Sequence, residues 1–356
     1  MRLGTFFIEN ETIFIYNEKK KDGERMENLK SRVTIYEVAK VAGVSLATVS
    51  RVINNNSLVS EKTRNKVNEV IKKLGYKPSA LAQGLATSKS TCIAIVIPSA
   101  NYVYISNMLN GMTDKAKELG YTLRLYTTSH NREDALEVME KVITSYVDGA
   151  IIFDDQFENE ELMKIASYSV PLVAINNDIE AENVGCIHFG YEHNVRGIVE
   201  EYLKNPDKEM YFLHSHNAGK LLARIEKAFT ETHIKHNVSY GILSSDDSYS
   251  KTYSDFLNFF KNTKRGYFLA YRDSLAAAIM NAAIDSGLKV PNDVEVMSLI
   301  GTKYAQIMRP QISSMHIDLY NIGAQAVEML TKLMNKEDVN KHCVIASEFV
   351  KRKTTL

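Results

Sequence analysis

The chain has 356 residues, with 43 basic and 43 acidic side chains, and so carries no formal net charge. No apolar run approaches the ~18 residues of a membrane-spanning helix, and no charged-then-apolar leader opens the sequence, so we expect neither a membrane protein nor an exported one. Cys92, Cys186 and Cys343 are odd in number and far apart, which argues against a disulfide framework. We expect them to be reduced core or surface residues without a metal role.

Residues 1–31 differ in texture from everything downstream, and we expect them to lie outside the fold. Met1 to Arg25 joins an aromatic, β-prone start to a charged run from Glu18 to Asp22. Two interpretations remain open: a genuine extension, or a translated leader upstream of a true start at Met26. We favour the leader, because D-G-E-R before Met26 can be encoded by purine-rich codons of the kind that bind ribosomes.

The segment from Thr34 to Asn54 reads T-I-Y-E-V-A-K-V-A-G-V-S-L-A-T-V-S-R-V-I-N and predicts two short helices around a tight turn. Apolar residues recur at helical spacing up to Ala42, and Gly43 then permits a turn where a side chain would crowd the next helix. Ser45 can cap that second helix. Its valines would pack inward and leave these residues facing outward: Leu46, Ala47, Thr48, Ser50 and Arg51. Such a face suits a DNA major groove, and an ordinary helix pair is the alternative.

A third amphipathic helix follows, capped by Ser60 and ended by Gly75. The segment from Ser31 to Ser88 carries nine Lys or Arg and three Glu, a charge of +6, so the rest of the chain sums to −6. A basic module on a mildly acidic body indicates a head that meets phosphates. We therefore predict a helix-turn-helix DNA-binding domain at 32–78 and a weakly helical linker at 79–90.

After Ser90, short apolar runs alternate with helical patterns, which predicts two similar α/β lobes within 91–356. The predicted strands are 93–98, 122–126, 149–153, 172–175, 209–214, 267–270 and 294–299. The predicted helices are 105–119, 132–145, 193–203, 220–232 and 274–286. This rhythm, with its β-branched runs, is typical of parallel sheets covered on both faces. Two such lobes predict a ligand cleft at the carboxyl ends of both sheets.

Five motifs carry a family resemblance: T-I-Y-E-V-A, G-V-S-L-A-T-V-S-R-V-I-N, A-L-A-Q-G-L-A-T, V-P-N-D-V-E-V and R-P-Q-I-S-S-M. From about Val33 to the C-terminus the chain resembles the LacI family of bacterial transcription regulators, and within it most closely the catabolite control protein A group. The resemblance implies a small all-α helix-turn-helix head. A hinge helix would join it to a two-lobed α/β body like that of periplasmic binding proteins.

The resemblance also implies how the chain is divided between the lobes. The first lobe would hold about 91–188 and 318–340, and the second about 189–317 and 341–356. The chain would cross near His188–Tyr191, near Met315–Leu319 and before the final strand. The helix from Ile322 to Met334 would belong to the first lobe, and the last strand, from Val344 to Val350, to the second. Such crossings act as hinges.

The resemblance assigns DNA contacts to the head. Leu46 and Ala47 occupy the positions used for operator discrimination, where reading would depend on shape and on contacts with thymine methyls. Arg51 is the best candidate for a bidentate contact to guanine, worth roughly 1–3 kcal/mol of discrimination. Residues at positions that mainly hold phosphates are Thr34, Tyr36, Ser45, Thr48, Ser50, Asn54 and Ser60.

The linker carries the sharpest single-residue prediction. In the family, paired linkers become helical on DNA and lie in the minor groove, where matching leucines wedge into the central base step and kink it. Leu85, beside Ala86, matches that leucine; a flexible tether is the alternative. Gln83 stands where an Arg is common, which should weaken attraction to the DNA backbone slightly.

The predicted cleft departs from the family pattern. Sugar- and purine-sensing members place an Arg where this chain has Leu221, so the fork suited to hydroxyl, carboxylate or phosphate is missing. Arg224 replaces a usual Gly, and S-L-I at 298–300 replaces Gly-Phe-Asp. Asp273 is either a hydroxyl acceptor or a helix N-cap. The effector-binding candidates are Asp154, Asn217, Leu221 and Asp273; a solvated loop is the alternative for Asp154.

We find no positive signal for enzyme chemistry. The segment His214-Ser215-His216 resembles a metal pair, but no carboxylate or Cys at fixed spacing completes it. Phosphate loops, nucleophile elbows and nucleotide-cofactor signatures are not found. We expect no catalytic residues, no metal and no cofactor.

Together these features predict a cytoplasmic, homodimeric transcription regulator, most simply a repressor, that binds a near-palindromic double-stranded operator in carbon-source control. Its small-molecule sensing would be altered or lost, and the catabolite control group implies another input, a phosphorylated carrier protein that docks as co-repressor. Two alternatives remain: a conventional sugar-responsive repressor released by inducer, and a ligand-binding module with a vestigial head.

Overall fold

A computed structural model describes residues 7–8, 11–12, 33–54, 57–78, 90–204, 206–215 and 219–356. The chain divides into two compact units between Ala82 and Gln83, inside the predicted linker. Within the predicted extension, β1 (Phe7–Ile8) pairs with β2 (Glu11–Thr12). Three residues with predicted roles lie outside the described residues: Leu85, Ala86 and Asn217.

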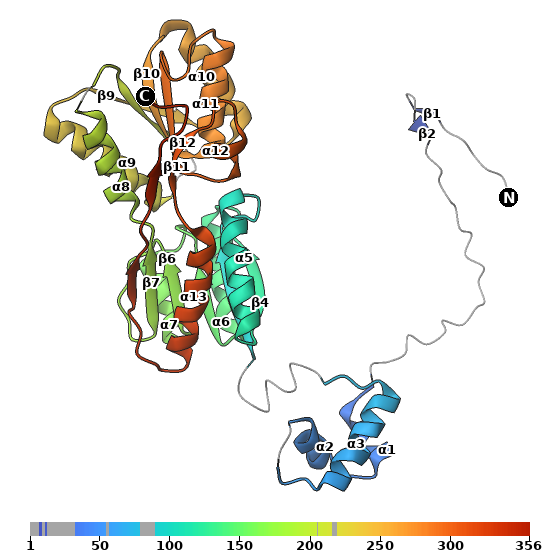
Figure 1. Ribbon diagram of the computed structural model, residues 1–356. Helices are drawn as coiled ribbons and strands as arrows, with labels where there is room; N and C mark the ends of the chain where they lie inside the picture. Colours follow the sequence, from blue (N-terminus) through green and yellow to red (C-terminus); the bar gives the residue numbers. More distant parts are fainter. Residues whose placement is uncertain are drawn as a thin grey trace. The chain divides into compact units, whose positions relative to one another are not determined.

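The head consists of α1 (Ile35–Ala42), α2 (Leu46–Ile53) and α3 (Glu61–Leu74) (Figure 1). Gly43 ends α1 in the left-handed region at φ 61°, which a side chain would disfavour, and this conformation makes the tight turn into α2. Val38, Val49 and Val67, one from each helix, are fully buried together. The predicted helix-turn-helix head is therefore confirmed.

The first lobe is built on a six-stranded parallel sheet in the order β13-β7-β6-β5-β3-β4. Its strands are β3 (Cys92–Ile97), β4 (Thr122–Thr127), β5 (Gly149–Ile152), β6 (Leu172–Ile175), β7 (Val184–His188) and β13 (His342–Val344). Side chains along β3 alternate between two cores, because strand residues point to opposite faces. One core packs against α5 (Val103–Glu118) and α13 (Leu319–Met334), the other against α6 (Arg132–Thr144) and α7 (Asn159–Ser167).

The second lobe repeats this plan with the strand order β14-β12-β11-β10-β8-β9. Its strands are β8 (Met210–Ser215), β9 (Tyr240–Ser245), β10 (Gly266–Arg272), β11 (Val294–Ile300), β12 (Ser313–His316) and β14 (Glu348–Val350). α8 (Tyr191–Tyr202) and α9 (Lys220–His236) cover one face, and α10 (Tyr249–Asn262) and α11 (Asp273–Asp285) cover the other. α12 (Lys303–Ile307) follows β11. Only β14 runs antiparallel to its neighbour among the described strands of this sheet.

The single strand predicted over 344–350 is wrong. Residues 342–344 form β13 beside β7 in the first lobe, whereas residues 348–350 form β14 beside β12 in the second. The extended run therefore crosses between the sheets at 345–347 and pairs with an edge of each. Residues 342–344 consequently belong with the first lobe, and not with the second as the predicted boundary at 341 has it. The other two crossings lie at 189–190 and 317–318.

α5 and α13 pack unusually closely in the first lobe, and Figure 1 shows them side by side. A Cβ added to Gly111 of α5 would lie 1.9 Å from the Tyr320 carbonyl oxygen on α13. Reciprocally, a Cβ on Gly323 would lie 2.0 Å from the Met108 carbonyl oxygen on α5. Each backbone thus occupies the space that a larger residue on the other helix would need. This close contact joins the C-terminal helix to the N-terminal part of the lobe.

Candidate nucleic-acid interface and interlobe cleft

α2 presents an exposed surface of the composition predicted for base reading. Val49 and Val52 anchor it in the head core, leaving Leu46 37% exposed at its first position. Ala47 and Arg51 are exposed as well, while Thr48 and Ser50 are partly buried. The remaining predicted DNA-contacting residues that the structure describes are all exposed: Thr34, Tyr36, Ser45, Asn54 and Ser60. Apolar, hydroxyl and guanidinium groups are thus offered together by one short helix and its surroundings.

The predicted phosphate-binding hydroxyls also hold the ends of the helices. Thr34 and Glu37 form a capping box at α1, with the Thr34 N–H donating to Glu37 Oε2 at 2.7 Å. These hydrogen bonds, first from the backbone and then from the side chain of Thr34, lower the pKa of Glu37. Ser45 and Ser60 cap α2 and α3 by accepting from the N–H groups of Thr48 and Thr63. Each cap satisfies one N–H group of the first helical turn, so the other N–H groups of that turn remain for phosphate oxygens.

Between the lobes of the body lies a cavity of about 80 Å³ at the carboxyl ends of both sheets. Its lining includes Asp154, Asn176, Ser215, Leu221 and Tyr271. Ligand pockets are typically about 300–1,000 Å³, whereas one water occupies about 30 Å³. The cavity is therefore smaller than a typical pocket for a sugar-sized ligand but has room for water. Within the described residues, the buried atoms Asn176 Nδ2 and Ser215 Oγ have no hydrogen-bond partner, so such waters would satisfy them.

A three-residue clamp connects the lobes across this cavity. Tyr102 precedes α5 in the first lobe and donates its hydroxyl to Asp247 Oδ2 of the second lobe at 2.8 Å. Arg272, at the end of β10, lies 4.5 Å above the Tyr102 ring and forms an ion pair with Asp247. Burial, followed by the charge of Asp247, raises the pKa of Tyr102 to about 12, so the hydroxyl remains a donor at neutral pH. The clamp thus couples a cation–π contact with a charge-assisted hydrogen bond.

A second set of interlobe contacts gathers at the N-terminus of α9. The Leu221 N–H donates to Asp155 Oδ2 at 3.3 Å, and Lys220 forms an ion pair with Glu158. One turn later, Arg224 Nη2 donates to the Asn176 carbonyl oxygen of the first lobe at 2.8 Å. Arg224 also pairs with Glu192 on α8 through Nε at 2.9 Å. The residue that replaces a usual Gly therefore joins the two lobes.

The structure agrees with only part of the predicted cleft. Asp154 and Leu221 line the cavity, but Asp154 is buried, accepting from Thr128 and from the Gln156 N–H at 3.0 Å, and does not belong to a solvated loop. Burial is the main cause of its raised pKa. Asp273 is not a cavity-lining residue.

Asp273 is instead buried against the segment that follows β11. Its Oδ2 accepts from the N–H and hydroxyl of Thr302 at 2.6 and 2.7 Å and from the Ala305 N–H at 3.2 Å. The predicted role as N-cap is therefore wrong, since Arg272 occupies the N-cap position. The role as effector ligand stays a prediction, which the lining of this cavity does not support. Sequence reasoning missed Tyr102, Asp247 and Arg272. The one signal was the polar run Y-R-D at the end of a buried strand, which contains Arg272 but not the other two.

None of the helices among the described residues is both long and apolar enough to cross a membrane. A model of the lacI family of bacterial regulatory proteins matches residues 34–79, and a model of periplasmic binding protein-like domains matches residues 211–355. The chain is 33% identical over 320 residues to catabolite control protein A of Staphylococcus xylosus, spanning 88% of this chain and 96% of the relative. Catabolite control protein A of Staphylococcus aureus strain Mu50 is 32% identical over 316 residues, with 88% and 96% covered.

Solved structures share the fold at lower identity. A lac repressor dimer bound to operator and the anti-inducer ONPF superposes with a TM-score of 0.79 at 24% identity, covering 92% of this chain and all of the other. The transcription regulator CcpA of Lactococcus lactis gives a TM-score of 0.64 at 21% identity, covering 74% of this chain and 99% of the other. The lac repressor structure therefore matches this chain over nearly its whole length, whereas the CcpA structure matches about three quarters of it.

Proposed function

The chain belongs to the lacI family of bacterial regulatory proteins, and we propose that it acts as a homodimer that binds a near-palindromic operator and represses genes of carbon-source use. It is a DNA-binding transcription regulator close to the catabolite control proteins, and not an enzyme. Its place of action would be the cytoplasm, where the DNA lies. The observation that carries the proposal is the exposed face of α2, with Leu46, Ala47 and Arg51 on one short helix.

The exposed face of α2 would recognise bases in two ways, by apolar contacts and by hydrogen bonds. Leu46 and Ala47 would contact thymine methyls, and Arg51 would donate to a guanine O6 and N7. The hydroxyls around the helix ends would hold phosphates and fix the register without selecting sequence. Because one head reaches few bases, a dimer with two half-sites is the simplest way to obtain specificity. The leucine wedge at Leu85 stays a prediction that rests on the family resemblance.

The cleft supports altered or lost sensing of small molecules. Leu221 stands where sugar- and purine-sensing members have an Arg, so the guanidinium that could bind a ligand is missing. The cavity beside Leu221 is about 80 Å³. The side chains of Tyr102, Asp247 and Arg272 bond to one another across the cleft. Their polar groups are therefore occupied and do not bind a sugar. We therefore rank a protein co-repressor, such as a seryl-phosphorylated carrier protein, above a sugar as the regulatory input.

Selection of duplexes from a random pool by the purified full chain tests the function. A near-palindromic consensus is expected, and recovery of no consensus at low ionic strength would contradict operator binding and favour a vestigial head. With the selected operator in hand, candidate sugars and then a seryl-phosphorylated carrier protein are added. Release by a sugar would replace our ranking with a conventional inducible repressor, whereas tighter binding with the phosphorylated carrier would support it.

Replacing Arg51 by Ala tests the base-reading role directly. The variant should lose roughly 1–3 kcal/mol of discrimination between operator and random duplex while retaining weak, salt-sensitive binding to any DNA. Lys73→Ala is the matched control, because it removes one exposed charge from the last turn of α3. Fluorescence anisotropy at several salt concentrations separates the two effects. Unchanged discrimination in Arg51→Ala would remove this residue from the recognition surface.

A further inference from the structure

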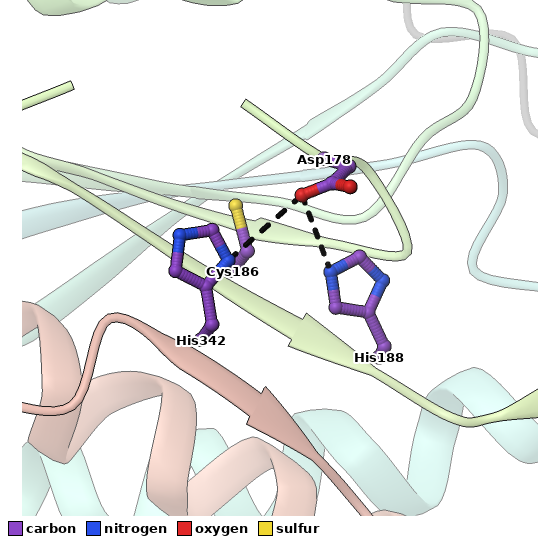
Figure 2. Close-up of side chains that lie close together, drawn as sticks. All are labelled: Asp178, Cys186, His188 and His342. Carbon is purple, nitrogen blue, oxygen red and sulfur yellow. Dashed lines mark ion pairs between the residues drawn. The ribbon is translucent and has the colours of Figure 1, made fainter. Parts of the chain in front are cut away.

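Four potential metal ligands meet at the edge of the first-lobe sheet (Figure 2). Cys186 and His188 are alternate residues of β7 and so lie on one face of the strand. His342 of β13 stands opposite Cys186 in the strand register, and Asp178 comes from the segment that follows β6. In Figure 2 all four side chains converge, with Asp178 between the two imidazoles. The fold thus joins residues that are far apart in sequence.

The spacing of the donor atoms is close to that of a metal centre. The four ligand atoms lie within 4.8 Å of one another. Asp178 Oδ1 lies 3.8 Å from His342 Nδ1 and 4.0 Å from His188 Nε2. Donors that share one tetrahedral zinc stand roughly 3.3–3.7 Å apart, as Zn–N and Zn–S bonds of about 2.0–2.3 Å require. Shifts of about 1 Å in the exposed Asp178 and His342 side chains would bring the donor atoms to these distances.

We propose that Asp178, Cys186, His188 and His342 form a binding site for a divalent cation of the zinc class. One thiolate, two imidazoles and one carboxylate suit zinc, whereas magnesium and calcium prefer oxygen ligands. The thiol proton of Cys186 leaves to solvent when the metal–sulfur bond forms. Four protein ligands fill a tetrahedral shell, so the site is structural and leaves no open position for catalysis. This proposal does not depend on operator binding.

The site lies where the chain is about to pass between the lobes. His188 is the last residue of β7 and precedes the crossing at 189–190, while β13 precedes the crossing at 345–347. The Ile345 N–H already donates to the His188 carbonyl oxygen at 2.8 Å. Asp178 follows Asn176, whose carbonyl oxygen accepts from Arg224 across the lobes. A bound cation would therefore tie together two crossings and a neighbouring interlobe contact.

Titration of the full-length protein with Co²⁺, followed by displacement with Zn²⁺, tests the site. We expect a thiolate-to-cobalt charge-transfer band and the visible bands of tetrahedral Co²⁺, both abolished by Zn²⁺. Cys186→Ser should remove the thiolate band. Cys343→Ser is the matched control, because Cys343 neighbours His342 on β13 but packs against the opposite core of the sheet. That variant should retain the full spectrum.

Surface variants guard against loss of folding in Cys186→Ser, since that residue is buried. The side chains of His342 and Asp178 are 48% and 73% exposed. His342→Ala and Asp178→Asn should keep the far-ultraviolet circular dichroism of the parent and weaken Zn²⁺ binding by more than roughly 10–100-fold, the loss that outer-shell partners cause. The proposal is overturned if Co²⁺ gives no thiolate band, if Cys343→Ser abolishes the band instead, or if both surface variants bind Zn²⁺ like the parent. Any of these outcomes would mean that the cluster consists of ordinary ion pairs between Asp178 and the two histidines and does not bind a metal ion.

Discussion

Lys208 and Glu295 form a buried ion pair in the second lobe, and its removal offers a quantitative test of the structure. Lys208 Nζ lies 2.7 Å from Glu295 Oε1, with the two side chains 0% and 7% exposed. Nζ also donates to the Pro291 carbonyl oxygen at 3.0 Å, and Glu295 Oε2 accepts from the Leu356 N–H at 2.7 Å. Both charges are thus satisfied by fixed partners, and one of these partners is the last residue of the chain.

Lys208→Met should be strongly destabilising, because it leaves the Glu295 carboxylate buried without its cation. Breaking one side of a buried pair costs about 3–5 kcal/mol of unfolding free energy. For a unit of this size each kcal/mol lowers the melting temperature by roughly 2–4 °C, so a fall of roughly 6–20 °C is expected. In the double variant Lys208→Met, Glu295→Met the hydrogen bonds to the Pro291 carbonyl oxygen and from the Leu356 N–H are lost, at about 1 kcal/mol each. The double variant should therefore be more stable than the single one.

Thermal and urea unfolding of the full chain, followed by circular dichroism, measures these differences. Lys204→Met is the matched control, since its ion pair with Glu201 is exposed and worth at most about 1 kcal/mol. A loss below about 1 kcal/mol in Lys208→Met would refute the reasoning. So would a double variant whose loss equals the sum of the losses in Lys208→Met and in the single variant Glu295→Met. Either result would mean that the charges are hydrated and uncoupled in the folded protein.

Three further outcomes are expected. Gly111→Ala should cost about 1–3 kcal/mol of unfolding free energy, because the added methyl group meets the backbone of α13. Gly197→Ala on α8 is the control; it has open space around it and should stabilise the protein by about 0.4–1 kcal/mol. Equal urea midpoints for the two variants would contradict the close contact between α5 and α13. Tyr102→Phe removes a hydroxyl that donates across the cleft, so the lobes should separate more often and expose the Leu221 N–H, which also bonds across the cleft. Hydrogen exchange of this N–H with solvent should become about tenfold faster. An unchanged exchange rate would mean that the clamp does not hold the lobes together. Burial lowers the pKa of His233, so the unfolded chain binds this proton first and stability falls as the pH drops below about 6.5. His233→Asn should flatten that dependence, and an unaltered slope between about pH 7 and 5 would count against it.

Local patterns predicted the head and most strands, because both depend on neighbouring residues. The caps at Thr34, Ser45 and Ser60 are each completed within three residues, and β3 is a continuous apolar run. β12 was missed because it begins with two serines. The hydroxyls of these serines bond to the distant C-terminal segment, where Ser313 Oγ accepts from the Arg352 N–H at 2.9 Å and Ser314 Oγ accepts from Arg352 Nη1 at 2.7 Å. β9, a half-exposed edge strand that contains a glycine, had no clear alternation either.

The sites depended on contacts over long distances in the chain, which no local pattern contains. Tyr102 and Asp247 meet although 145 residues separate them, and Asp273 was misplaced because its partner Thr302 lies 29 residues ahead. For the proposed metal site, the sequence showed only Cys186 and His188 at strand spacing. His342 joins them because the final strands cross between the sheets, the feature that the sequence predicted incorrectly.

The three crossings also determine how this protein can be recombined. The head occupies one continuous stretch and could be exchanged with that of another regulator as a cassette by a single splice within 79–90. Each lobe, by contrast, is formed by segments that are separated in the sequence, so a single continuous fragment of the chain cannot supply a whole lobe. Grafting a foreign lobe would require matched joints at 189–190, 317–318 and 345–347. New operator specificity is therefore easier to import by recombination than new ligand specificity.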